Sequence, residues 1–252
     1  MEFIVVTFFG ILGAILASFV GVIVERAYTG QSWSAGRSRC DSCGRILRSL
    51  DLIPVLSWFF SFGRCRVCGA HISVLNPLAE LMLGALFALS YLSLGLTFAL
   101  IPFLLALLAL AFIVLYDLKH TVIPGAASAL LLVASFAYVL LAAPSREALG
   151  GALLTAGSIG GAFFLLFLLS KGRAMGLGDA PVALALALLA FPNALSGLLF
   201  SFWIGALVGI AILVLRRGGP RMGLEVPFAP FLAAGFLLAH FTGWNPFLLM
   251  LL

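Results

Sequence analysis

The sequence predicts an all-α polytopic membrane protein with about eight transmembrane helices and one small polar insert. Of the 252 residues, 63% are hydrophobic and only 9% are charged, against roughly 45–50% and about 25% in soluble domains. The apolar residues gather in runs close to the ~20 residues that a helix needs to cross a bilayer. So few charges cannot cover a soluble globule, and the composition also argues against a disordered or nucleic-acid-binding chain.

The apolar runs divide the chain into spans. The first covers residues 3–24 and is followed by Arg26, the reverse of the charge order in a cleavable signal peptide, so we expect a retained helix. The further runs cover residues 78–96, 98–116, 121–143 and 149–170, the two halves of 180–215 around Pro192 and Asn193, and a last run from Val226 to near Gly243 and Pro246. We expect each half of 180–215 to span with about 18 residues, near the lower limit of crossing length.

The basic residues orient the spans. Of the 14 lysines and arginines, only Arg146 falls in a loop opposite to the others, which include Arg216, Arg217 and Arg221 before the last run. Because short positive loops face the cytosol, we expect the insert at residues 25–76 to be cytosolic. The net charge of +5 is then mainly a topology signal, with contact to anionic lipid headgroups as a secondary effect.

All four cysteines fall in the insert, as the pairs Cys40/Cys43 and Cys65/Cys68, each followed at once by a glycine. Two thiolates two residues apart grip one metal from a tight turn, so two such pairs predict a tetrahedral Zn²⁺ site. Two disulfides are the alternative, but they rarely persist in a reducing cytosol. Four protein ligands leave no open coordination position, so the metal is expected to fold the insert rather than to catalyse.

Between the cysteine pairs, residues 52–60 are too apolar for a free loop and too few to span. We expect them to lie on the membrane surface or to pack on the spans. The predicted domains are a first transmembrane helix at 1–24, a cytosolic zinc-binding loop domain at 25–76 and a transmembrane domain at 77–252.

Two of the scarce acids lie at the same membrane edge in this topology. Asp117 closes the third span, and Asp179 opens the sixth span after Gly176 and Gly178. Both could be helix caps. Alternatively, the two carboxylates meet, share one proton and activate a water, as in aspartyl proteolysis. Glycines beside Asp179 would let a substrate backbone approach it closely, and the sequence alone leaves both interpretations open.

The chain resembles the type IV prepilin peptidases, which are polytopic membrane aspartyl proteases of the GxGD class. The resemblance runs from the first span to the last. It is carried by Ser18-Phe19, Ser38-Arg39-Cys40-x-x-Cys43-Gly44, Ile53-Pro54-x-x-Ser57-Trp58, Gly63-Arg64-Cys65-Arg66-x-Cys68-Gly69, Asn76-Pro77-Leu78-x-Glu80-Leu81, Asp117-Leu118-x-His120-x-x-Ile123-Pro124, Gly176-x-Gly178-Asp179 and Pro227-Phe228-Ala229-Pro230-Phe231-Leu232-Ala233.

The resemblance implies an enzyme of the bacterial cytoplasmic (inner) membrane that removes the leader of prepilins or pseudopilins, with Asp117 and Asp179 as the catalytic pair. Many members that carry the cysteine loop also methylate the new N-terminal amine with S-adenosylmethionine. Glu80 matches an acidic position that the family associates with methyl transfer. An acid in the first turn that complements the helix dipole is the alternative role for Glu80.

Several positions depart from the usual family pattern: Gly21, Glu25, Gly125, Ala180-Pro181 and Ala229. The first two lie in the half associated with methyl transfer, so a peptidase without methyltransferase activity stays open as an alternative. Pro181 stands where a lysine is usual, which removes a charge beside the site and would alter substrate choice.

Two other classes of membrane protein compete with the peptidase. A proton-coupled transporter or an assembly scaffold would also carry acids at membrane depth, but here Asp117 and Asp179 are expected at one edge rather than in mid-span. A metal-dependent membrane protease would need an HExxH-like helix and an open metal site, and the sequence contains no such motif.

Overall fold

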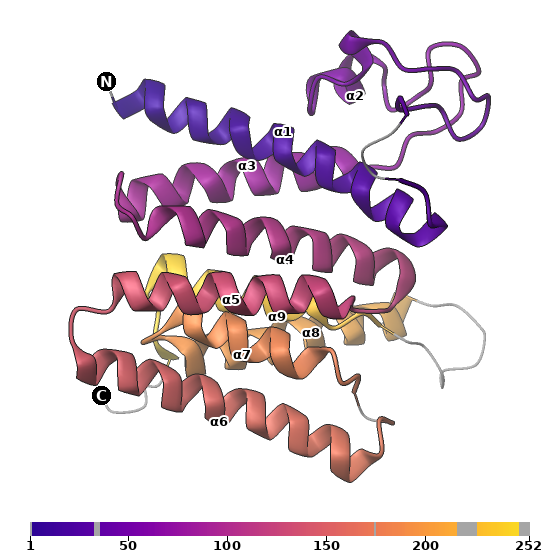
Figure 1. The fold of residues 1–252 in the computed structure, drawn as a ribbon. Helices are drawn as coiled ribbons and strands as arrows, with labels where there is room; N and C mark the ends of the chain where they lie inside the picture. The colour runs from indigo at the N-terminus through magenta and orange to yellow at the C-terminus, as the bar shows by residue number, and fades with distance from the viewer. Residues whose placement is uncertain (1, 33–35, 174, 216–225, 247–252) are drawn as a thin grey trace. The chain divides into compact units, whose positions relative to one another are not determined.

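A computed structural model describes residues 2–32, 36–173, 175–215 and 226–246. The chain forms two compact units, Met1–Leu96 and Thr97–Leu252, both built from helices (Figure 1). Three residues used above for orientation, Arg216, Arg217 and Arg221, lie outside the described residues. The unit boundary at residue 96 groups the second long helix with the insert. A compact unit need not coincide with a functional domain, so the domain boundary expected at residues 76/77 stays a prediction.

The first unit consists of two long helices and the insert between them. Helices α1 (Glu2–Thr29) and α3 (Leu75–Leu94) pack along each other, and the insert carries the short helices η1 (Ser49–Asp51) and α2 (Leu56–Phe60). Glycines bring α1 and α3 into backbone contact. A Cβ added at Gly13 would lie 2.6 Å from the Leu83 carbonyl oxygen, and one at Gly84 would lie 2.8 Å from that of Gly10. Small residues at such crossings permit close helix packing in lipid.

The described part of the second unit is a bundle of six helices, of which α7 is central and buried. Helix α7 contacts α5, α6, α8 and α9, while α4 packs on α5 and α9. The helices are α4 (Leu100–His120), α5 (Gly125–Ala142), α6 (Arg146–Ser170), α7 (Asp179–Ala190), α8 (Ala194–Leu215) and α9 (Ala229–Thr242).

Every apolar run of the sequence forms a helix, which confirms the predicted fold class. Among the described residues, α1, α3, α4, α5, α6 and α8 are long and apolar enough to cross a membrane, whereas α7 and α9 have 12 and 14 residues. The expected length of about 18 residues for the sixth run is therefore wrong. Most of α7 is buried among its neighbours, and a helix enclosed on all sides by protein is as apolar as a lipid-facing one.

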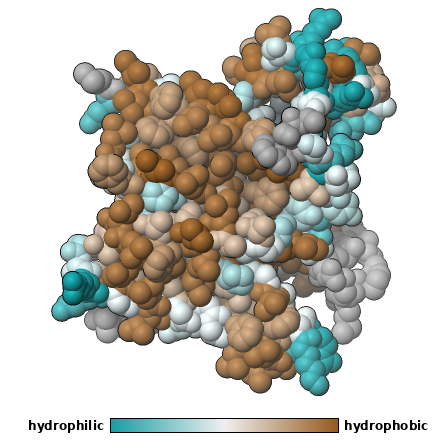
Figure 2. Space-filling model, viewed as in Figure 1, coloured by the Kyte–Doolittle hydropathy of each residue, from teal (hydrophilic) through white to brown (hydrophobic). Residues whose placement is uncertain are grey.

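The surface of the helices suits a lipid environment. Large apolar side chains are exposed along the long helices, among them Phe8 at 59%, Leu105 at 47% and Leu207 at 69%. Brown, hydrophobic side chains cover much of the face seen in Figure 2. A soluble monomer rarely exposes apolar patches of this extent, so we assign these faces to the bilayer.

The contact between α1 and α3 gives a direct test of this packing. We expect Gly13→Ala to destabilise the first unit by about 1–3 kcal/mol, because overpacking a tight contact forces the backbones apart. Gly21→Ala in the same helix is the matched control, since a Cβ there meets nothing within 4 Å. Thermal unfolding in detergent measures both variants, and equal midpoints would contradict the packing described.

Candidate active site and candidate metal centre

Asp117 lies in the last turn of α4 and is buried, with 5% of its surface exposed. Its Oδ2 accepts a hydrogen bond of 3.1 Å from the backbone N–H of Ala229. Ala229 is the first residue of α9, followed by Pro230. The N–H groups of a first helical turn have no partner within their own helix, so the Asp117 carboxylate satisfies one of them and fixes the start of α9 beside the end of α4.

Asp179 is the first residue of α7 and is also buried, with 7% exposed. Its carboxylate interacts electrostatically with that of Asp117, and it accepts a hydrogen bond from the backbone of Gly176. A Cβ added at Gly176 would lie 3.6 Å from Asp179 Oδ2. The two aspartates therefore come together within the second unit, and Gly176 keeps side-chain atoms away from one of them.

Gly178 contributes to the same arrangement by packing. A Cβ at Gly178 would lie 2.8 Å from the Cβ of Ile123, so the missing side chain lets the turn after α4 rest on the loop before α7. That turn begins at Thr121, which adopts a left-handed φ of 53° and donates its N–H to the Asp117 carbonyl oxygen at 2.8 Å. The approach of a substrate backbone to Gly176 and Gly178 stays a prediction, and the geometry leaves more room for it at Gly176.

The two aspartates do not act as the caps that the sequence also permitted. The N-cap residue of α7 is Gly178, without a side-chain hydrogen bond, and that of α5 is Pro124. Asp117 instead bonds the first residue of a helix more than a hundred positions away. Two buried carboxylates that interact electrostatically repel each other when both are ionised, so the pair is suited to binding one proton.

The insert is organised by two turns of the same construction. In the first, Cys40 donates its N–H to Arg45 O at 2.9 Å and accepts from Gly44 N at 2.8 Å; in the second, Cys65 donates to Ala70 O at 2.8 Å and accepts from Gly69 N at 2.9 Å. Both glycines have a left-handed φ, near 70°, which a side chain would strain.

The two turns bring the four thiols together. The Sγ atoms of Cys40, Cys43, Cys65 and Cys68 lie within 4.8 Å of one another, and those of Cys40 and Cys68 are 3.8 Å apart. Hydrogen bonds from the backbone N–H groups of Cys68 and Val67 lower the pKa of the Cys65 thiol to about 6, whereas burial raises the pKa of the Cys68 thiol to about 11. Of these two, Cys65 therefore favours the thiolate form that binds metal. The cluster predicted from the cysteine spacing is thus assembled and can hold one metal ion.

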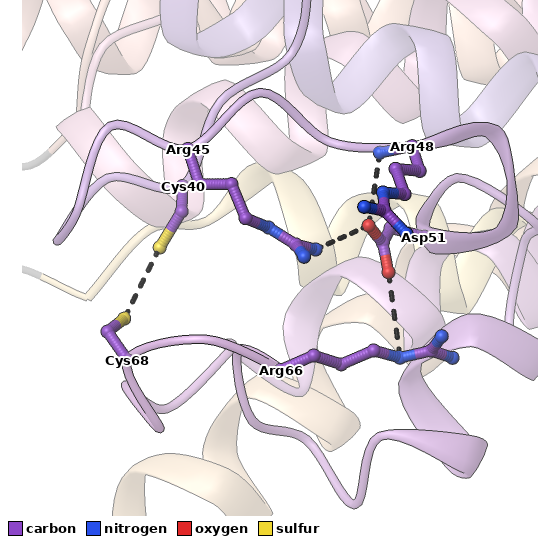
Figure 3. A network of polar contacts seen from close by, with 6 residues as sticks. All are labelled: Cys40, Arg45, Arg48, Asp51, Arg66 and Cys68. Atoms are coloured by element: carbon purple, nitrogen blue, oxygen red, sulfur yellow. Dashed lines mark hydrogen bonds and ion pairs between the residues drawn. The ribbon is translucent and has the colours of Figure 1, made fainter.

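Asp51 links the two turns through their arginines (Figure 3). Its Oδ2 pairs with the Arg45 guanidinium and accepts the Arg48 backbone N–H at 3.0 Å, while its Oδ1 lies 3.6 Å from Arg66 Nε. Arg45 follows the first cysteine pair, and Arg66 lies inside the second. One carboxylate therefore bridges the two halves of the cysteine cluster.

Glu80 also has a partner in the insert. It is buried near the start of α3, and its Oε2 accepts the Val55 backbone N–H at 2.6 Å. Val55 precedes α2 and adopts a left-handed φ of 60°, which is rare for a β-branched residue. The carboxylate thus holds the start of α2 against α3. A part in methyl transfer, suggested by the sequence, stays a prediction.

Comparison with known proteins identifies the family. Residues 11–94 match the model of the Bacterial Peptidase A24 N-terminal domain. A prepilin leader peptidase/N-methyltransferase of Bacillus subtilis (strain 168) is 32% identical over 236 residues, which cover 92% of each chain. The chain belongs to the prepilin leader peptidase/N-methyltransferase family.

Two further members of this family support the assignment. The relative from Myxococcus xanthus (strain DK1622) is 35% identical over 85% of this chain, which spans 65% of that relative's length. The one from Dichelobacter nodosus is 33% identical over 84% of this chain and 70% of the relative. No solved structure was found to match the chain.

Several contacts of these sites could not be read from the sequence. The partner of Asp117 is a backbone N–H of Ala229, and a backbone group leaves no mark on residue identity. The one available signal for this contact was Pro230 in the first turn of α9. Proline favours helix starts, and the backbone N–H groups at a helix start have no partner within their own helix. The pairing of Asp51 with Arg45 and Arg66 had no signal beyond opposite charge.

The Asp51 bridge predicts how easily the insert opens. We expect Asp51→Asn to speed trypsin cleavage after Arg45 and Arg66 roughly two- to fivefold, since a partly exposed ion pair is worth at most about 1 kcal/mol. Asp41→Asn, an exposed acid of the first turn, is the matched control and should leave the rate unchanged. Equal cleavage rates in the two variants would show that Asp51 does not hold the halves together.

Proposed function

We propose that this protein is an aspartyl endopeptidase that removes the leader of type IV prepilins or pseudopilins. The observation that carries the proposal is the convergence of Asp117 and Asp179, both buried and joined by an electrostatic interaction, in a chain of this family. Substrate identity rests on the printed names of the relatives, which call them prepilin leader peptidases.

The proposed chemistry uses the dyad as one unit. One carboxylate takes a proton from a water, whose oxygen attacks the scissile carbonyl carbon, while the protonated carboxyl polarises the carbonyl oxygen. The C–N bond then breaks and the leaving amine takes a proton. The Ala229 N–H holds the Asp117 carboxylate in place during these transfers, and Gly176 leaves room for the peptide beside Asp179.

The competing membrane classes fit the geometry less well. A proton-coupled transporter would need acids that continue a path through the bundle, whereas both aspartates lie at helix ends, in the last turn of α4 and at the start of α7. Along the described part of the chain, the one cluster able to hold a metal consists of four cysteines. Four thiolate ligands close a zinc site, so metal-dependent proteolysis has no open position to use.

We propose that the cysteine cluster holds a structural Zn²⁺ bound by Cys40, Cys43, Cys65 and Cys68. The approach of the four Sγ atoms within 4.8 Å suits a tetrahedral thiolate site. When bound, the ion supplies folding energy to the insert.

For the second activity of the family we propose N-methylation of the trimmed pilin, with S-adenosylmethionine as the methyl donor. The support is the N-methyltransferase name of the relatives and the match of residues 11–94 to the N-terminal domain of the family. The hydrogen bond of Glu80 to Val55 supports a structural task for this acid. A peptidase without methyltransferase activity is the alternative.

For the location we propose a multi-pass protein of the bacterial cytoplasmic membrane, with the metal centre and the aspartates on the cytosolic side. Lys119 in the last turn of α4 and Lys171 at the end of α6 lie at the helix ends that lead toward the dyad. Arg146 begins α6 at its opposite end. The excess of positive charge at one end supports this orientation.

The dyad is tested by isosteric amides. We expect Asp117→Asn and Asp179→Asn each to slow leader cleavage by roughly 10²–10⁴-fold, the usual contribution of a positioned acid or base. Asparagine also accepts a backbone N–H, so insertion and metal content should be unchanged. Mass spectrometry of a prepilin peptide incubated with detergent-purified protein measures the cleavage.

Glu147→Gln, an exposed acid in the first turn of α6, is the matched control and should cleave normally. If cleavage is retained in either aspartate variant, the dyad is wrong. With S-adenosylmethionine present, methylation of an already trimmed pilin should survive both aspartate changes, because that activity is assigned to the cysteine-bearing half.

The metal is tested by elemental analysis of protein purified without chelators. We expect about one Zn²⁺ per chain, and Cys40→Ser or Cys68→Ser should lose the metal and loosen the insert because structural zinc contributes folding energy. Ser42→Ala, within the first turn but not a ligand, should keep the metal. Metal-free wild-type protein would refute the zinc centre.

A further inference from the structure

The insert presents a group of large apolar side chains that no described residue of the first unit covers. We call Leu56, Phe59, Phe60 and Phe62 the aromatic patch; their exposed fractions are 52%, 67%, 66% and 87%. The sequence suggested that this segment either packs on the spans or lies on the membrane surface. The exposure of these side chains argues against packing on the spans of the first unit, α1 and α3.

The backbone around the patch is fixed. Trp58 donates its Nε1–H to Ile72 O at 3.2 Å, and its ring fills the space above Gly63, where a Cβ would lie 2.9 Å away. Phe62 adopts a left-handed φ of 52°, an unfavourable conformation for a bulky residue. These contacts hold the backbone beneath the patch, and the phenylalanine side chains above it are exposed.

One hydrogen bond ties the start of the patch to a helix that is able to cross the membrane. The Val55 N–H, immediately before α2, donates to Glu80 Oε2 at 2.6 Å. Glu80 belongs to α3, a helix long and apolar enough to cross the bilayer, whose neighbouring residues Leu78 and Leu81 are 49% and 59% exposed. The patch thus begins beside the end of a membrane helix at which lipid-facing side chains start.

The charge around the patch suits the surface of an anionic membrane. In residues 30–74 the acids are Asp41 and Asp51, and Asp51 is already paired with Arg45 and Arg66. The arginines of the same stretch are Arg37, Arg39, Arg45, Arg48, Arg64 and Arg66. Exposed aromatic side chains within a segment of net positive charge are the pattern by which protein segments bind anionic lipid interfaces.

From these observations we propose that the aromatic patch inserts into the boundary between headgroups and acyl chains of the membrane that α1 and α3 cross. Lipid is then the partner that covers Phe59, Phe60 and Phe62, while the arginines meet anionic headgroups. The insert is held to the bilayer by this contact as well as by its two flanking helices. This proposal does not depend on the peptidase activity, so either can fail alone.

Tryptophan quenching in bilayers tests the proposal on the full chain. The parent has Trp33, Trp203 and Trp244 replaced by Phe and keeps Trp58, which packs on Gly63. Reporters are Phe62→Trp in the patch and, as the matched control, Ser42→Trp at the exposed tip of the first cysteine turn. Both are reconstituted in vesicles of phosphatidylglycerol and phosphatidylethanolamine, with or without acyl chains brominated near the glycerol.

We expect brominated lipid to reduce the Phe62→Trp signal, after subtraction of the parent, roughly twofold, because inserted apolar faces lie about 5–10 Å below the headgroup boundary. Aqueous iodide should quench Ser42→Trp strongly and Phe62→Trp weakly. If iodide quenches Phe62→Trp and brominated lipid does not, the patch faces water and the proposal is wrong. If neither quencher acts on Phe62→Trp, protein covers the patch, as a pilin segment or a second copy would, and lipid insertion is again refuted.

Discussion

The second unit depends on how it accommodates two buried carboxylates. A carboxylate removed from water needs hydrogen-bond donors or a proton, and here backbone N–H groups of Ala229 and Gly176 serve as donors. Those donors belong to the start of α9 and to the loop before α7. The hydrogen bonds that satisfy the two carboxylates therefore bring the end of α4, the beginning of α7 and the beginning of α9 together. The same convergence that makes the acids tolerable also places two electrostatically interacting carboxylates beside Gly176, which carries no side chain.

Hydropathy predicted the helices well because lipid requires every backbone polar group to be satisfied within a helix. Each apolar run of the sequence is a helix, and breaks fell where Pro192 and Asn193 indicated. The lengths of α7 and α9 could not be predicted in this way. Burial by protein and burial by lipid select the same residues, so the run containing α7 looked like a span although its neighbours enclose it.

The candidate sites were predictable where spacing itself carries the chemistry. The cysteine pairs predict a metal centre because ligand geometry restricts their separation. The two aspartates were predicted as a pair from the family resemblance together with the topology. The contacts that hold these residues in place could not be predicted from the sequence. The contact of Gly178 with Ile123, the backbone donor at Ala229 and the bridge by Asp51 depend on distances between segments remote in sequence, which composition and periodicity do not encode.

The likeness of the two cysteine turns bears on how the insert assembles. Each turn is closed by the same backbone hydrogen bonds between residues close in sequence, so each can form as soon as its own short segment has left the ribosome. The two folded turns must then come together. The main free-energy cost of that step is the entropy lost when the segment between them is closed into a loop. Asp51, in the connecting segment, attracts both halves before any ion arrives. A metal ion bound there would meet thiols already preorganised in pairs, and its binding energy would go to the final closure rather than to folding each turn.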